Sequence, residues 1–444
     1  MSSDEVLRAA MTLPLLDRVT PAEALWASSD EGVPISDGDE QDAVAQAQRR
    51  GAELSSGQTT GRSHEPMMDA ARRVLDRDSA MTLRDSRLWI QLSLLCVLMF
   101  LAGGAWAAGM ETVKIAPDGK GFILHPSGDR YIPWGHNYAS VDIMERLANN
   151  PARVEREFIE MKAAGTTVAR IHPELPRILA GADKADPKSL DQLRKLLKIA
   201  EISGIHLKIT GLACYQIKDR LAWYDSMDEQ DRWKTQEFFW ETIARTCADS
   251  PAVFAYDLVN EPGAAGKRSD GWYMGRMGEV EFCQRLSLDP GERNGDDIFR
   301  EWTKRMVAAI RKQDQTHLIT MGMLPFPGAY KACAEQLDFV SPHLYPKTGK
   351  VHEEIKLLKQ FDWGKPIVIG ETFPLQCGAD DERDFLLKSR DFAHGWMGHW
   401  PDESPATLAE LKKTGKATIH NAIWLSWVDL FKEIGPQMTG ETSR

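Results

Sequence analysis

The sequence predicts an α/β protein whose main part is a (β/α)8 TIM barrel. From Met110 onward, short runs rich in β-branched residues alternate with amphipathic stretches of helical length. Eight such runs are each followed by a helix-like stretch, and eight is the number of parallel strands that closes this barrel. A doubly wound open sheet is the alternative, but no G-x-G-x-x-G sequence follows the first strand. We therefore expect a closed barrel.

The barrel part begins with a predicted hairpin, in which residues 121–124 and 131–138 are strands and residues 126–129 are the turn. The second of these runs continues as the first barrel strand. The other barrel strands are predicted at 167–172, 205–212, 253–260, 317–323, 338–345, 366–371 and 393–400. Helices are predicted at 151–164, 187–203, 228–247, 296–313, 328–336, 352–361, 381–392 and 417–432.

Composition excludes several classes of protein. With 34 Gly, 23 Pro and 6 Cys in 444 residues, the chain is neither collagen-like nor a disulfide scaffold. Lys and Arg number 54 against 65 Asp and Glu, a net charge of −11, and this balance argues against nucleic acid as a partner. The histidines lack the spacing of a metal site, and no G-x-S-x-G sequence occurs. We expect no metal, no cofactor and no protein partner.

A change in composition marks a boundary near residue 109. Every basic residue before Lys114 is an arginine, and residues 1–80 hold 15 acidic residues against 8 arginines. We therefore expect three parts. These are a short helical N-terminal segment at 1–80, a signal peptide or signal anchor at 81–108, and the barrel domain at 109–444.

The second part carries the features of an export signal. Its apolar run at 88–108 has 21 residues, enough to span a bilayer core of about 30 Å. Arg84 and Arg87 precede the run, and Ala105-Trp106-Ala107 ends it with the small-x-small form of a signal-peptidase site. The barrel is then secreted or periplasmic. If the run is not cleaved, it anchors the chain in the membrane by a single span, with the barrel outside.

The first part has its own pattern. The runs Met11-Thr-Leu-Pro-Leu-Leu-Asp-Arg18 and Ala22-Glu-Ala-Leu-Trp-Ala-Ser28 precede an acidic middle and a helical stretch at 69–75. Over residues about 5–75 the chain resembles the addiction-module components, which are short antitoxin-like bacterial proteins. Two interpretations stay open: a cytoplasmic appendage on a signal anchor, or a gene-model extension upstream of a true start at Met81. We favour the second.

Two glutamates end strands on opposite sides of the predicted barrel. The fourth strand ends in Asn260-Glu261-Pro262, and the seventh ends at Glu371. Because alternate residues share a face, we expect Asp257, Val259 and Glu261 to point the same way, toward the barrel mouth. Active sites of such barrels lie at the carboxyl ends of the strands. Two carboxylates about 5–5.5 Å apart are what retaining glycoside hydrolysis requires.

On these motifs, residues about 115–432 resemble the clan A glycoside hydrolases, and most closely glycoside hydrolase family 5. The resemblance implies that Glu261 is the acid/base and Glu371 the nucleophile. It also implies that Asn260 hydrogen-bonds the sugar 2-hydroxyl, and that Arg170 lies near the nucleophile.

The resemblance assigns further residues that contact substrate or the two glutamates. In the sixth strand, His343 and Tyr345 share a face and correspond to the residues that touch the acid/base and the nucleophile. In the eighth strand we expect Trp396, Gly398 and Trp400 to face inward, with Trp400 as the sugar platform.

At the end of the first strand, His136 and Asn137 are candidate subsite residues, with a role in hairpin packing as the alternative.

Two departures from the family pattern are visible. Many members have a histidine at the end of the third strand, where this chain has Tyr215 and Gln216 nearby. The loop at 263–294 is long, and such loops tend to be functional. We expect it to wall off one end of a groove, which favours short or end-on substrates.

The sequence thus predicts a retaining glycoside hydrolase that cleaves β-glycosidic bonds in a β-glucan or β-mannan type of glycan. The alternative is a catalytically inactive, carbohydrate-binding barrel. A third reading assigns the function to the N-terminal segment. The sequence leaves open the gluco or manno configuration of the sugar and the endo or exo mode of action.

The export signal gives the first prediction. Cleavage after Ala107 or Ala108 should leave a soluble enzyme, because the apolar run that could hold the chain in a membrane is then removed. N-terminal sequencing of the secreted protein checks this. Recovery of a membrane-bound chain that still begins at Met1 would support the signal anchor instead.

Overall fold

The computed structural model describes residues 109–212 and 215–440. The N-terminal segment and the apolar run at 88–108 lie outside these residues. Within the described part of the chain, no helix combines the length and apolar composition that a membrane span requires. The described residues of 110–412 and 420–440 form one compact unit.

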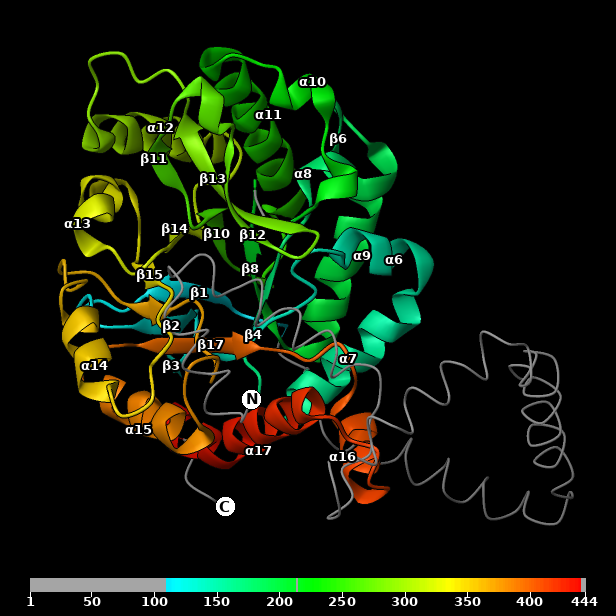
Figure 1. Cartoon of the computed structure of the whole chain (residues 1–444). Coiled ribbons are helices and arrows are strands. Elements are labelled where there is room, and N and C mark those ends of the chain that lie inside the picture. The colour runs from blue at the N-terminus through cyan, green and yellow to red at the C-terminus, as the bar shows by residue number, and fades with distance from the viewer. Residues whose placement is uncertain (1–108, 213–214, 441–444) are drawn as a thin grey trace, which may run out of the picture. The chain divides into compact units, whose positions relative to one another are not determined.

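Eight parallel strands form the centre of this unit (Figure 1). They are β4 Trp134–Asn137, β5 Val168–Ile171, β8 His206–Thr210, β10 Val253–Asn260, β14 Leu318–Met323, β15 Ser341–Pro342, β16 Val368–Ile369 and β17 Gly395–His399. Their order in the sheet is β15-β14-β10-β8-β5-β4-β17-β16. Parallel bridges from Val340 to Ile367 and from His343 to Glu371 join the two end strands. The sheet therefore closes into the predicted barrel.

Every helix that the sequence predicted within the described residues is present. They are α7 Pro151–Ala163, α9 Pro187–Ser203, α11 Glu229–Cys247, α12 Gly295–Arg311, α13 Pro327–Tyr330 with the 3₁₀ helix Lys331–Gln336, α14 Val351–Lys359, α15 Ala379–Ser389 and α17 Ile419–Thr439. Four further helices were not predicted: α6 Ile143–Asn149, α8 Leu175–Ile178, α10 Ala222–Asp225 and α16 Pro405–Lys413. These four are short and lie in connections, where periodicity gives little signal.

Helix α9 shows why the longer helices were predictable. The Asp186 side chain caps its first turn by accepting hydrogen bonds from the backbone N–H groups of Lys188 and Ser189. Pro187 occupies the first helical position, where no N–H partner is needed. Gly204 ends the helix with φ at 63°, in the left-handed region that glycine adopts without strain. The local sequence therefore predicts both the first and the last residue of this helix.

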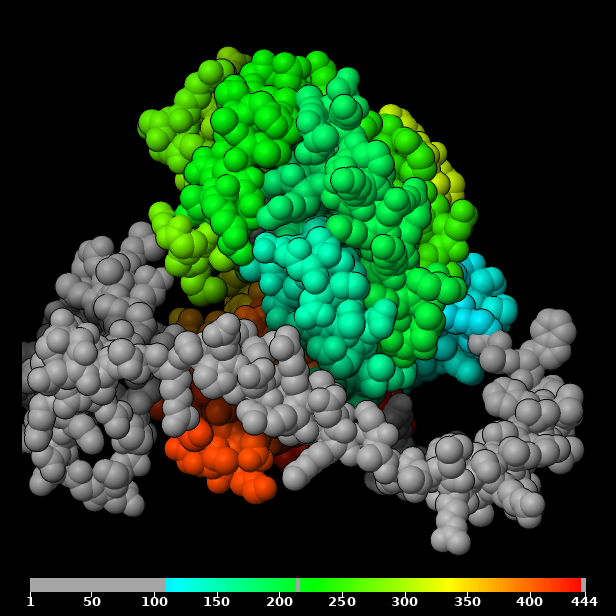
Figure 2. All heavy atoms as spheres, turned by 90° about the vertical axis from the view of Figure 1, so that its right-hand side faces the viewer, coloured from blue at the N-terminus to red at the C-terminus, as the bar shows by residue number. Residues whose placement is uncertain are grey.

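Three of the helices cover one side of the barrel. Helices α6, α7 and α9 contact one another on the right of Figure 1. The space-filling view from that side shows their blue-green and green atoms as a continuous surface (Figure 2). An amphipathic helix on a barrel buries its apolar stripe against the strands and exposes its polar face.

The amino-terminal end of the barrel is closed by the predicted hairpin. It forms a three-stranded antiparallel sheet of β1 Thr112–Ile115, β2 Phe122–His125 and β3 Arg130–Tyr131. The ring of Phe122 lies 5.2 Å from that of Phe254 and 5.4 Å from that of Phe339, centroid to centroid. These rings belong to an apolar cluster that includes Val168 and Ala255 of the barrel interior. The floor of the barrel is therefore apolar.

The insertion after β10 is not a plain loop. Residues 263–294 contain β11 Gly263–Ala265, β12 Tyr273–Met277 and β13 Val280–Ser287. Together with β9 Tyr215–Gln216 they form a small sheet, here called the insert sheet, in which β13 pairs with all three other strands. The insertion is therefore held in place by strand pairing and is not an irregular loop.

The predicted facing of the eighth strand is wrong. The Trp396 indole donates a hydrogen bond to Ser389 Oγ of helix α15, so this ring faces outward. A Cβ on Gly398 would lie 1.8 Å from Trp427 of helix α17, which shows that position 398 also faces the helices. Met397 instead belongs to the cluster inside the barrel. The strand is one residue out of phase with the prediction, because aromatic residues suit the helix layer as well as the interior.

Candidate active site

Two glutamates meet at the carboxyl ends of the strands. Glu261 directly follows β10, and one residue separates Glu371 from the end of β16. One oxygen of each carboxylate and one ring nitrogen of His343 all lie within 4.8 Å of one another. The three are buried or nearly so, and the Glu371 side chain is the most accessible at 14%. The sequence prediction that these two carboxylates share one mouth is therefore matched by their positions.

The end of β10 has an irregular backbone. Its register with β14 shifts between Asp257 and Asn260, and Glu261 has φ at 46°, in the left-handed region. Such a conformation costs a side-chain-bearing residue about 1–3 kcal/mol and is typical of functional sites. As a result, Asp257 and Asn260 both reach the barrel interior, whereas Val259 joins the apolar cluster with the helices. The expectation that Val259 shares the face of Asp257 is wrong.

Glu371 accepts hydrogen bonds on both carboxylate oxygens. Arg170 Nη1 donates to Oε1 over 2.5 Å, and the Tyr345 hydroxyl donates to Oε2 over 2.6 Å. His343 Nδ1 lies 3.5 Å from Oε1, and His399 Nε2 lies 3.8 Å from Oε2. Burial alone would raise the pKa of this carboxyl. The neighbouring His343, Arg170 and His399, with the Tyr345 hydrogen bond, outweigh burial and hold the pKa well below its usual range.

Glu261 has a different and less cationic surrounding. Its Oε1 lies 2.7 Å from His343 Nδ1, and its Oε2 accepts a hydrogen bond from Cys283 Sγ over 3.2 Å. Cys283 comes from β13 of the insert sheet, and the same strand binds Asn260, whose Nδ2 donates to the Phe282 carbonyl over 2.9 Å. The insert sheet therefore lies directly against the predicted acid/base.

Arg170 connects the site. Its guanidinium is fully buried and donates to Asp257 Oδ2, Asn137 Oδ1 and Asn260 Oδ1, each over 2.8 Å, as well as to Glu371. A planar guanidinium presents its donors in a fixed fork, so these four acceptors are held in one geometry. The predicted proximity of Arg170 to Glu371 corresponds to a direct ion pair.

Below this arginine lies a second group of buried polar side chains that the sequence reasoning missed. Lys208 Nζ donates to Ser341 Oγ over 2.6 Å and lies 3.1 Å from Asp257 Oδ2. Thr210 Oγ1 donates to the same Asp257 oxygen over 2.9 Å. The signal for this group was the alternation His206-Leu-Lys208-Ile-Thr210, which puts polar residues at every second position of a barrel strand. His399 and Cys283 were also missed, because only the fold brings them to the carboxylates.

Two predicted subsite residues, His136 and Trp400, lie against each other. His136 is 1% exposed, and its ring lies 3.9 Å from that of Phe431 in helix α17. Trp400 is 6% exposed and packs edge-on against His136, with the ring centroids 5.0 Å apart. Asn137 points into the barrel toward Arg170, so the neighbouring His136 points to the opposite side, toward the helices. The expectation of His136 as a sugar contact is therefore wrong, because the phase of β4 turns its ring toward helix α17. The expectation of Trp400 as the sugar platform stays a prediction.

Asn137 lies in the site but is fully engaged with protein. Its Nδ2 donates to the carbonyls of Gly370 and Gly398 over 3.0 and 2.9 Å, while its Oδ1 accepts from Arg170. It is 3% exposed. Asn137 therefore orients Arg170, and the predicted direct contact with substrate is not supported.

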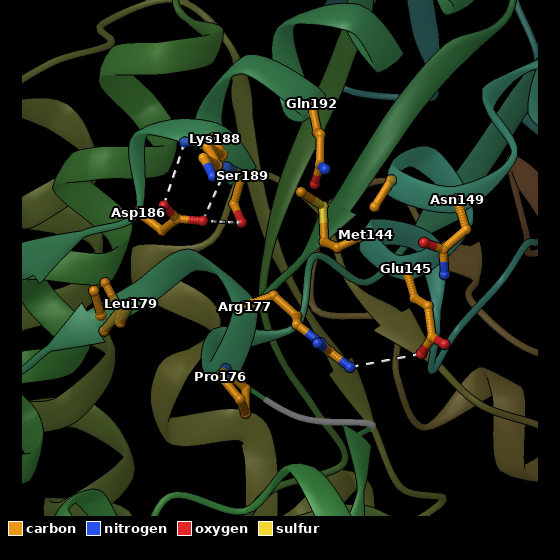
Figure 3. Close-up of a pocket in the computed structure, with 12 residues that line it drawn as sticks. Met144, Glu145, Asn149, Pro176, Arg177, Leu179, Asp186, Lys188, Ser189 and Gln192 are labelled. Carbon is orange, nitrogen blue, oxygen red and sulfur yellow. Dashed lines mark hydrogen bonds and ion pairs between the residues drawn. The ribbon is translucent and has the colours of Figure 1, made fainter.

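A surface pocket lies elsewhere on the molecule. It has a volume of about 500 Å³ and lies between helices α6, α8 and the start of α9 (Figure 3). Arg177 and Glu145 face each other across it, 3.5 Å apart, and Asp186 is held by the backbone that it caps. None of the residues around the two glutamates lines this pocket. The chemistry therefore belongs to the carboxylate cluster and not to this pocket.

Two carboxylates and an imidazole are also groups of the kind that bind a metal ion. Each carboxylate oxygen already has a hydrogen-bonding partner: Arg170 and Tyr345 on Glu371, and His343 and Cys283 on Glu261. This arrangement is the one expected for carboxylates that act on substrate directly.

Comparison with known proteins agrees with this geometry. Residues 133–372 match the sequence profile described as "Cellulase (glycosyl hydrolase family 5)". The chain belongs to glycosyl hydrolase family 5. It is therefore a glycoside hydrolase with a TIM-barrel domain. A mannan endo-1,4-β-mannosidase A from Podospora anserina is 24% identical over 292 residues, with 57% of this chain and 69% of that protein covered.

Solved structures show the same fold. An exo-β-1,4-mannosidase from Opitutaceae bacterium strain TAV5 matches with a TM-score of 0.55 at 15% identity over 74% of this chain. The match covers 63% of that protein, so the present chain spans less than two thirds of its length. An endo-1,4-β-mannanase from Rhizomucor miehei matches with a TM-score of 0.50 at 16% identity, with 72% and 99% of the two chains covered.

A glycine beneath the site gives the second prediction. A Cβ on Gly322 would lie 2.9 Å from both Arg170 Nη2 and His343 Nε2. Gly322→Ala should therefore displace the arginine and the imidazole and lower kcat/KM about 100-fold. Overpacking should cost about 1–3 kcal/mol of unfolding free energy, so the protein should still fold.

Steady-state kinetics and urea unfolding measure the two effects. Gly328→Ala is the control, since nothing lies within 4 Å of the Cβ that it adds. Parent-level turnover in folded Gly322→Ala would show that the site tolerates the displacement.

Proposed function

We propose that this glycoside hydrolase is a retaining enzyme for β-mannan-type glycans, with Glu371 as nucleophile and Glu261 as acid/base. The observation that carries this proposal is the approach of the two carboxylates to within 4.8 Å. An inverting enzyme needs room for a water molecule between its carboxyl groups, which are about 6.5–9.5 Å apart. The shorter separation supports direct attack by one carboxylate on the sugar.

The different surroundings of the two glutamates support the division of roles. Glu371 is held as a carboxylate by Arg170 and Tyr345, as a nucleophile must be. The second carboxylate, Glu261, lies within 4.8 Å of Glu371, where the acid/base of a retaining glycosidase lies. Glu261 is then the group that can give a proton to a leaving group.

The reaction follows in two displacements. In the first, a Glu371 oxygen forms a bond to the anomeric carbon as the glycosidic bond breaks, and the leaving oxygen takes the proton of Glu261. In the second, the Glu261 carboxylate removes a proton from water, whose oxygen bonds to the anomeric carbon and releases Glu371. Arg170 and Tyr345, which contact the two oxygens of Glu371, stabilise the negative charge that Glu371 loses in the first displacement and regains in the second.

The substrate class rests on the relatives and on the insert sheet. The Podospora anserina relative is a mannan endo-1,4-β-mannosidase, which supports a β-1,4-linked mannan or its oligosaccharides. The contact of β13 with Asn260 and Glu261 supports a wall beside the acid/base. A wall there favours short substrates, or chains that enter end-on, over internal cleavage of a long polymer. A β-glucan substrate is the other outcome of the test below.

The third prediction concerns the two carboxylates. In Glu371→Ala no glycosyl-enzyme can form, so turnover should fall by several orders of magnitude, and azide should restore activity with an inverted product. In Glu261→Ala an activated aryl β-mannoside should still form the intermediate, because its leaving group needs no proton. Azide should then give a β-glycosyl azide with net retention. NMR of the azide products distinguishes the two.

Opposite stereochemistry in these products would reverse the assignment. Hydrolysis of an unactivated substrate by either alanine variant at the parent rate would remove that residue from catalysis. Binding without turnover by the parent protein would support the inactive carbohydrate-binding barrel.

The fourth prediction concerns the mode of action. With borohydride-reduced mannopentaose, the wall formed by the insert sheet should restrict cleavage to one end of the chain. One short product should therefore dominate from the first minutes of the reaction. Chromatography of early products checks this, and a β-1,4-gluco-oligosaccharide of equal length is the control. A spread of intermediate lengths would show internal cleavage, and faster cleavage of the control would indicate a glucanase.

A further inference from the structure

Beneath the two glutamates lies a layer of three buried charges, Arg170, Lys208 and Asp257, here called the ion layer. All three side chains are fully buried. A buried ionised group is stable only when it is paired and its hydrogen bonds are satisfied. The ion layer must therefore be considered together with Glu371, the nearly buried carboxylate that touches it.

The charges of these four residues balance. Asp257 and Glu371 both have pKa values well below the usual range, so both are ionised, and burial opposes this in each case. Two cations face them, Arg170 and Lys208. Without the lysine, one guanidinium would face two buried carboxylates, and one carboxylate would tend to bind a proton.

The geometry divides the cations between the carboxylates. Lys208 Nζ lies 3.1 Å from Asp257 Oδ2, and its other contact is Ser341 Oγ at 2.6 Å. Arg170 meets Asp257 through Nε but meets Glu371 through Nη1, over the shorter distance of 2.5 Å. Lys208 thus has a direct contact with Asp257 and none with Glu371, whereas Arg170 contacts both carboxylates.

We propose that Lys208 is a positioning residue that neutralises Asp257 and so leaves the charge of Arg170 to hold Glu371 ionised. This role rests on the proposed function of Glu371 as nucleophile. Lys208 contacts neither the Glu371 carboxylate nor the barrel mouth, and it acts through Asp257 and Arg170. Burial lowers the pKa of Lys208 to about 8 while Asp257 raises it, so the ammonium form is present at neutral pH.

Other titratable groups also face Glu371 and affect its proton affinity. They are Arg170 and His172 from β5 and the residue beyond it, Lys208 from β8, Asp257 and Glu261 from β10 and its end, His343 and Tyr345 after β15, and His399 from β17. A test of Lys208 must leave this set unchanged except for the charge under study.

The test compares the acidic limb of the pH profile of kcat/KM among charge variants, with an activated aryl β-mannoside as substrate. This limb reports ionisation of the nucleophile, because glycosylation of such a substrate needs no proton from Glu261. Lys208→Met removes one positive charge, so the limb should move to higher pH by about one unit. At a pH on the acidic side of the limb, kcat/KM of the variant should then be about tenfold lower than that of the parent. Asp257→Asn removes a negative charge, so the limb should move to lower pH.

The double variant Lys208→Met/Asp257→Asn restores the balance, and its limb should return close to that of the parent. A purely structural role would shift no limb, or would make the double variant worse than either single one. Lys195→Met is the matched control, because this lysine is exposed on helix α9. If Lys208→Met does not fold, Lys208→Gln has the same loss of charge and keeps a donor for Ser341.

The outcomes separate this inference from the proposed function. If Glu371→Ala keeps its turnover, the nucleophile assignment fails and the inference fails with it. If Glu371→Ala is inactive but the limb of Lys208→Met coincides with the parent limb, Asp257 takes the proton or the charge is unimportant. In that case the inference alone is overturned.

Discussion

The buried guanidinium of Arg170 is the interaction on which the rest of the site depends. One rigid cation in the barrel interior links Glu371, Asp257, Asn137 and Asn260, which come from three different strands or strand ends. A lysine could not replace it, because a point charge lacks the fork of donors that meets four acceptors at once. The positions of the carboxylates are therefore set by a cation that is itself shielded from water.

Burying such a cation costs free energy of desolvation. The barrel interior compensates this cost with two layers, an apolar one at the lower end and a polar one above it. The lower end of the barrel is apolar and is closed by the hairpin through Phe122, so water has no access from that side. Above this floor, side chains two residues further along the strands supply the ions and their hydrogen-bonding partners. Gly322 and Gly370 leave the space that the His343 ring and Arg170 occupy. The polar layer is thus compact and almost fully paired.

The sequence predicted the strand and helix order, and it named Arg170, His343 and Tyr345 beside the two glutamates. It failed where strand phase decides the outcome. His136 lies at a strand end, and a shift of one position turned its ring from the mouth to the helix layer. Short apolar strands give no local signal of phase when both of their faces are buried.

The sequence by itself determined the alternation of elements, the helix ends with their capping residues, and the two glutamates at strand ends. These features are local, since they depend on propensity, capping and spacing along the chain. Only the tertiary structure decided that Cys283 of the insert sheet meets Glu261, and that Lys208 of β8 pairs with Asp257 of β10. Contacts of this kind join residues far apart in the chain, and they follow from barrel closure and strand register, which no local pattern encodes.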